Sequence, residues 1–176
     1  MASPTEPTEP GDRARAFGNQ LIDVHNWLRD ELDRLREDVE RHLDGEVWRP
    51  RDLRANCLTF CSALTRHHTG EDRGAFPLLG KEFPELRPVL AELERDHHLV
   101  NEVLRGLADL LGGLGGSRDT AEARRVRTEL DTLAALLETH LTYEEKRIVA
   151  ALDSLSVPAW RRDTPDFLRS TGNPEV

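Results

Sequence analysis

Apolar residues recur every three or four positions along four long segments of the chain, which is the spacing of helices that bury one face. The first predicted helix spans about residues 15–43 and ends before Gly45 and Pro50. The second begins near Pro50 and is expected to end at Gly74 and Pro77. The third spans about residues 86–114 and the fourth about residues 119–155, with the flexible stretch GGLGGS between them.

Four amphipathic helices with short connections predict an all-α fold, an up-down-up-down four-helix bundle over residues 14–156. The connection GAFPLLGKEFPELRP is expected to contain one short helical turn. The Pro/Thr/Glu-rich leader, residues 1–13, has too few apolar residues to fold and is predicted to be disordered. Residues 157–176 are predicted to form an irregular tail, from which Trp160 and Phe167 can pack back onto the bundle.

Composition narrows the possible partners and the location of the protein. The formal net charge of -9 disfavours nucleic acid and anionic membranes as partners. The sequence has no apolar stretch of membrane-spanning length and no secretory leader, so we expect a soluble cytoplasmic protein. The only cysteines, Cys57 and Cys61, lie one helical turn apart and are predicted to be buried, reduced thiols.

Histidines stand at positions where a bundle core would normally hold leucine. Of the seven histidines, four lie on the apolar stripes, one in each helix: His25, His67, His97 and His140. A buried imidazole nitrogen without a partner costs about 1–3 kcal/mol, so four such side chains need a common solution. A shared metal centre would supply partners for all of them.

Two carboxylates strengthen this interpretation. Glu71 follows His67 by four residues and Glu144 follows His140 by four, so each pair lies on one helix face. Imidazole and carboxylate together suit iron, manganese or zinc. The pairs His42/Glu46 and His98/Glu102 have the same spacing. We expect the first pair to be solvated at a helix end and the second to lie off the apolar stripe.

The segments HHTGEDRGAFPLL, HLTYEEKRIVAAL, LIDVHNWL and LERDHHLV resemble the hemerythrin-like HHE cation-binding domain family over about residues 15–155. The resemblance implies two non-haem iron ions inside a four-helix bundle, bridged by the two motif glutamates and by an oxo or hydroxo oxygen. It also implies a set of ligand positions, which in this chain are His25, His67, Glu71, His97, His140 and Glu144.

The chain departs from the oxygen carriers of that family at two places. Asn101 stands where the carriers have a second histidine on the third helix, and Glu144 and Glu145 stand four and five residues after His140, where the carriers have an aspartate at five. The pattern is closer to the bacterial H…HxxxE…H…HxxxE subtype and to the hemerythrin domain of the iron-sensing F-box ubiquitin-ligase subunit. That iron sensor has an acidic ligand at the position of His68. We therefore expect His68 to be a further ligand; the alternative is a histidine at the rim, in contact with solvent or with a ligand.

Several neighbours are assigned supporting roles. Asp72 is expected to be a surface carboxylate or to contact a ligand, and Asp96 to orient His97 or His98. Tyr143 is expected to serve ordinary packing. Trp27, Phe76 and Leu78 are expected to belong to an apolar shell around the site.

The sequence thus favours a di-iron protein that binds or reacts with a small oxidant, namely dioxygen, hydrogen peroxide or nitric oxide. If it is an enzyme, it would be an oxidoreductase that consumes peroxide or nitric oxide. Three alternatives remain open: an iron- or oxygen-sensing module without turnover, a bundle that holds a single zinc or other divalent ion, and a metal-free interaction bundle. No feature of the sequence specifies a protein partner.

Overall fold

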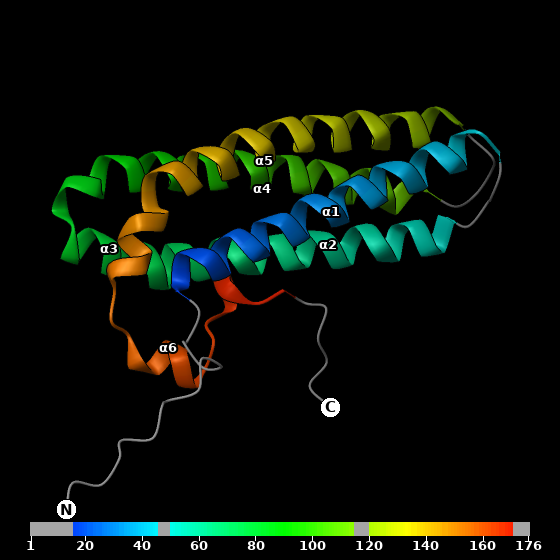
Figure 1. The fold of residues 1–176 in the computed structure, drawn as a ribbon. Coiled ribbons are helices and arrows are strands. Elements are labelled where there is room, and N and C mark those ends of the chain that lie inside the picture. Colours follow the sequence, from blue (N-terminus) through cyan, green and yellow to red (C-terminus); the bar gives the residue numbers. More distant parts are fainter. Residues whose placement is uncertain (1–15, 46–49, 115–119, 171–176) are drawn as a thin grey trace, which may run out of the picture.

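The fold is built from long helices that lie alongside one another (Figure 1). The computed structural model describes residues 16–45, 50–114 and 120–170. The four long helices are α1 (Phe17–Leu43), α2 (Pro50–Gly70), α4 (Arg87–Gly113) and α5 (Thr120–Ser154). The described residues contain no strand, so the predicted all-α class is confirmed. The predicted leader, residues 1–13, lies outside the described part of the chain.

The first helix ends where the sequence predicts. The backbone N–H of Asp44 bonds to the carbonyl of Glu40 at 2.9 Å, and Gly45 follows with a φ of 75°. Glycine adopts this left-handed conformation without the strain that a Cβ would cause, which explains its place directly after the helix.

The second helix does not end at Gly74 and Pro77, contrary to the prediction. A π-helical segment, η1 (Glu71–Ala75), follows α2 directly and leads into α3 (Phe76–Glu82). Pro77 is tolerated because it falls in the first turn of α3. The 3₁₀ turn η2 (Pro84–Leu86) then joins α3 to α4. The supposed connection therefore mostly continues the helix, and π-turns of this kind often occur at functional sites.

The apolar core is divided into two clusters by a layer of buried polar side chains. The larger cluster fills the bundle from Val24 to Val39 of α1 and contains Cys57 and Cys61, which are free thiols. The smaller cluster lies around Phe17, Phe76 and the last turns of α5. None of the described helices combines the length and the apolar character needed to cross a membrane.

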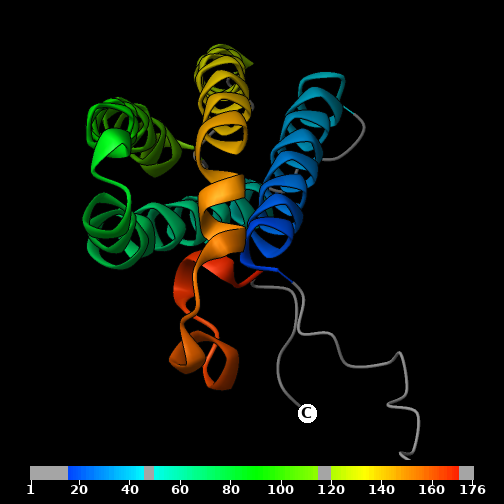
Figure 2. The ribbon, with the colours of Figure 1, turned by 60° about the vertical axis from the view of Figure 1, so that its left-hand side comes forward.

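The described part of the C-terminal tail, residues 157–170, packs beneath one end of the bundle and is not wholly irregular (Figures 1 and 2). It contains α6 (Pro158–Arg162) and the 3₁₀ turn η3 (Asp166–Leu168). The Trp160 ring lies edge-on to Phe17 at 5.2 Å and to Phe167 at 5.3 Å between centroids. Phe167 is 1% exposed, so the expected packing of these two tail aromatics is confirmed.

Candidate metal centre

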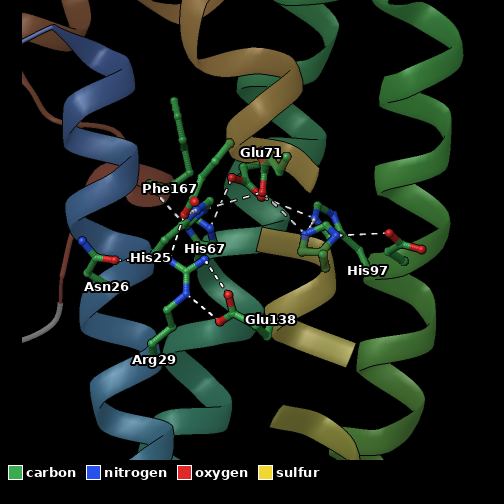
Figure 3. A network of polar contacts seen from close by, with 12 residues as sticks. His25, Asn26, Arg29, His67, Glu71, His97, Glu138 and Phe167 are labelled. Atoms are coloured by element: carbon green, nitrogen blue, oxygen red, sulfur yellow. Dashed lines mark hydrogen bonds and ion pairs between the residues drawn. The ribbon is translucent and has the colours of Figure 1, made fainter. Parts of the chain in front are cut away.

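The seven residues predicted as ligands all lie in the polar layer between the two apolar clusters, and each is at most 2% exposed. Their potential ligand atoms form two groups, each within 4.8 Å. The first group is His25, His67, Glu71 and Glu144. The second group is His68, His97 and His140. Figure 3 shows His25 of α1, His67 and Glu71 of the continuous α2–η1 segment, and His97 of α4 converging on one place.

The two carboxylates belong to the first group and also contact the second. Glu71 places one oxygen 3.2 Å from Nε2 of His67 and the other 3.4 Å from Nε2 of His97. Glu144 Oε2 lies 3.5 Å from Nε2 of His25 and 3.5 Å from Nε2 of His140. Each carboxylate therefore contacts one imidazole of each group, which is the arrangement that a pair of bridging ligands requires.

Four of the five imidazoles are held from outside by a hydrogen bond from Nδ1. His25 donates to Glu145 Oε1 at 2.9 Å, and His97 donates to Asp72 Oδ1 at 2.7 Å. His140 donates to Asp96 Oδ2 at 3.3 Å.

His67 donates to the main-chain oxygen of Phe167 at 2.8 Å. With Nδ1 bonded on the outside, each of the four rings directs its Nε2 toward the centre of the layer. Imidazoles that bind metals are commonly oriented in this way.

His68 is the exception among the five imidazoles. Neither of its ring nitrogens has a hydrogen-bond partner among the described residues, although the side chain is 1% exposed. Its ring stacks on that of His97 with centroids 4.0 Å apart and planes inclined by 12°. The alternative of a solvated histidine at the rim does not fit this burial.

The layer contains many buried polar atoms that have no hydrogen-bond partner within the described part of the chain. They are Nε2 of His25 and His67, both nitrogens of His68, and both oxygens of Glu71 and of Glu144. Each would cost about 1–3 kcal/mol if it stayed unsatisfied. Metal ions bound at the two groups would satisfy them together, and a set of imidazoles with carboxylates suits iron, manganese or zinc. The residues present thus fit a metal centre.

Burial and mutual contact shift the pKa values in the layer. Burial, followed by the neighbouring imidazoles, lowers the pKa of His67 and His68 and brings that of His140 to about 3. Burial also lowers the pKa of His97, but the hydrogen bond to Asp72 and the nearby Glu71 carboxylate outweigh it and raise the value to about 10. Burial and the nearby Glu144 raise the pKa of Glu71.

Some of the supporting residues differ from expectation. Asp96 was expected to orient His97 or His98 but contacts His140 on α5, because adjacent residues of a helix point in different directions. His42 was expected to be solvated but is only 5% exposed, and Glu46 lies outside the described residues. His98 is exposed, as its position off the apolar stripe predicts. Tyr143 packs against the smaller apolar cluster, as expected, and its hydroxyl donates to Glu92 at 2.7 Å.

The expected apolar shell is present. The ring of Phe76 stacks on His97 with centroids 5.5 Å apart. Leu78 packs against the smaller apolar cluster and Trp27 against the larger one. Asp72 takes the second of its two expected roles, because it contacts His97 directly.

The sequence prediction missed a chain of charges behind His25. Glu145 accepts hydrogen bonds from His25 and, at 2.8 Å, from Arg29 Nη1, while Arg29 Nε donates to Glu138 at 2.8 Å (Figure 3). Burial raises the pKa of Glu145, but His25 and Arg29 outweigh it and lower the value to about 2. The helical spacing held a clue, because Arg29 stands one turn after His25.

The fold and the site together define an all-helical bundle whose buried histidines and carboxylates can hold metal ions. The family model of the hemerythrin HHE cation binding domain matches residues 18–152, and the chain belongs to this family. No curated protein and no solved structure matches the chain significantly.

Proposed function

We propose that this protein holds two iron ions, joined by an oxo or hydroxo oxygen, and that it binds or reacts with a small oxidant. The candidates for the oxidant are dioxygen, hydrogen peroxide and nitric oxide. The proposal includes the up-down-up-down order of a four-helix bundle and a cytoplasmic location. The observation that carries it is the pair of ligand groups, both of which Glu71 and Glu144 contact.

The two groups support an assignment of the ligands. His25 and His67 would hold one iron, and His68, His97 and His140 the other, with Glu71 and Glu144 shared. The group with two histidines offers one imidazole fewer, so we assign the position for the oxidant to that side. When bound, the iron pair supplies redox chemistry and an open coordination position.

The chain itself supplies orientation and shielding. The bonds from Nδ1 orient four imidazoles so that Nε2 points to the centre of the layer, where a metal would bind. The stacked ring of Phe76 and the two apolar clusters keep bulk water from the layer. The side chains of Asp72 and Asp96 are 34% and 42% exposed, and they contact the buried imidazoles of His97 and His140. Each aspartate can therefore pass a proton between its imidazole and solvent.

The test is the metal content of the purified chain by mass spectrometry, with an absorption spectrum of the same sample. We expect about two irons per chain and near-ultraviolet bands of an oxo bridge, as a carboxylate-bridged pair in a bundle core implies. About one zinc per chain, or no metal after anaerobic reconstitution with ferrous iron, would contradict the proposal and favour the single-ion or the metal-free alternative.

A sensing role without turnover is favoured by one observation, the bond from His67 to the tail residue Phe167. Because this hydrogen bond joins the tail to a proposed ligand, a change in the metal at His67 would alter how the tail is held. Titration of the iron-loaded protein with each oxidant separates the roles. Repeated consumption of peroxide or nitric oxide indicates an enzyme, whereas a single stoichiometric change indicates a carrier or a sensor.

A further inference from the structure

One ligand imidazole is oriented by a part of the chain outside the long helices. We use the name tail clamp for residues 158–168, which comprise α6 and η3. The main-chain oxygen of Phe167 in the tail clamp accepts the Nδ1 hydrogen of His67 at 2.8 Å, in a fully buried contact (Figure 3). The corresponding partners of His25, His97 and His140 are carboxylates on α5, η1 and α4.

Apolar side chains hold the tail clamp in place. Phe167 and Leu168 are 1% and 6% exposed and belong to the smaller apolar cluster, which Trp160 also contacts. The η3 turn is closed by hydrogen bonds from the N–H of Leu168 to Pro165 at 2.9 Å and from the N–H of Arg169, the residue after the clamp, to Asp166 at 3.2 Å. The position of the carbonyl that His67 uses is therefore set by the docking of this segment.

The clamp approaches α2 directly at Gly70. A Cβ at this position would lie 3.0 Å from the backbone nitrogen of Phe167 and 3.3 Å from its Cβ. Gly70 has ordinary helical angles, with φ of -63° and ψ of -37°, so its backbone conformation does not require glycine. Glycine within a helix costs about 1 kcal/mol relative to alanine. The close approach of the tail accounts for its presence.

We propose that the tail clamp is a positioning element of the metal centre, and that its docking and metal occupancy at the His25/His67/Glu71/Glu144 group favour each other. This inference rests on the proposed function. A docked clamp holds the His67 ring with Nε2 directed at that group. Because coupling between two binding events is reciprocal, a metal held by His67 strengthens docking. A partner that captured the released tail would weaken metal binding at the same group.

The first test is hydrogen exchange in the full-length protein with and without iron. The amides of Leu168 and Arg169 should exchange about 10-fold more slowly in the iron-loaded protein, within the usual range of coupling energies. Equal exchange in a sample that contains bound iron would overturn this inference and leave the proposed function intact. Failure to bind iron at all would overturn both.

The second test compares Gly70→Leu with the control Gly106→Leu. Both glycines lie within helices and are partly exposed, but a Cβ at Gly106 would meet no atom within 4 Å. In Gly70→Leu, a chelator should remove one of the two irons at least about 10-fold faster than in the unmodified protein. The control should release both at the original rates.

A difference between the release rates of the two irons distinguishes a positioning role from a general loss of stability. Only one iron should be affected, because His67 belongs to one group only. Equal acceleration of both irons in Gly70→Leu, or no acceleration of either, would overturn the inference. Gly70→Ala displaces the clamp less and should show a smaller change in the same direction. It keeps the test decisive if the leucine variant does not fold.

Discussion

The Nε2 atoms of His97 and His140 face each other at 3.1 Å across the interface of α4 and α5. Both rings donate from Nδ1 to an outer aspartate, so one of the two facing nitrogens must carry a proton when no metal is bound. Despite its burial, contacts with Asp72 and Glu71 raise the pKa of His97 to about 10, whereas burial lowers that of His140 to about 3, so we expect His97 to carry the proton. In the metal-free protein, a proton thus lies between the Nε2 atoms of His97 and His140, where a metal ion would bind both.

Metal loading should therefore release protons. A metal needs the Nε2 lone pair of His97, so binding near neutral pH should displace at least about one proton per chain, and apparent affinity should fall as the pH is lowered. Calorimetric titration with ferrous iron in buffers of different ionisation enthalpy measures this number. A binding heat that does not depend on the buffer would contradict the prediction.

Substitution of His68 should separate metal affinity from the stability of the metal-free fold. His68→Leu removes two buried nitrogens that lack partners among the described residues, so we expect the metal-free protein to gain up to about 1–3 kcal/mol. The same change should loosen the iron of the three-histidine group without emptying the site. Chemical denaturation without metal and iron content after dialysis provide the two measurements. His98→Leu, at an exposed position on α4, is the control, and unchanged iron content in His68→Leu would exclude a ligand role.

The carboxylate behind His25 offers a matched pair of variants. Glu145→Gln should weaken iron binding by about 10-fold or more, because it removes the anion that orients His25. Glu138→Gln changes a carboxylate that contacts Arg29 but no ligand, and its side chain is 59% exposed, so iron binding should be nearly unchanged. Competition with a chromogenic chelator measures both. Equal losses in the two variants would assign the effect to Arg29 and not to His25.

The two cysteines should be unreactive in the folded protein. Burial raises the pKa of Cys57 to about 12 and that of Cys61 to about 11, so both are neutral thiols at pH 8. A thiol reagent at pH 8 should label them only as fast as the protein unfolds, and rapidly in denaturant. Fast labelling of the native protein would contradict their burial.

The same shifts predict how stability responds to alkaline pH. The folded pKa values lie above the ordinary value of 9.0, so the contribution of the thiols is fully present below about pH 9 and is lost as the pH rises toward 11–12. Cys57→Ala should reduce this alkaline loss. Denaturation midpoints of the two proteins at pH 8 and pH 10.5 provide the comparison.

Helical periodicity predicts that His25, His67, His97 and His140 lie on buried faces, and the four-residue spacing adds Glu71 and Glu144. His68 lies off that pattern, and only the family resemblance pointed to it. The sequence could not predict the partner of His67, since every residue has a main-chain carbonyl and nothing in the sequence distinguishes that of Phe167. Gly74 and Pro77 were misread because local rules treat them as helix stops. The π-turn at Glu71–Ala75 instead carries the helix into a new first turn, where proline is accepted.

The division of the core has a consequence for the lifetime of the chain. The larger apolar cluster draws on α1, α2, α4 and α5, whereas the smaller one draws on α1, α3, α4, α5 and the tail. The two halves of the bundle can therefore melt separately on either side of the polar layer. Metal ions held across that layer would join the halves into one cooperative unit. The smaller half, which also carries the tail, would then be the first to open in a cell short of iron. Proteolysis could begin there, and the abundance of the protein would follow the supply of its own metal.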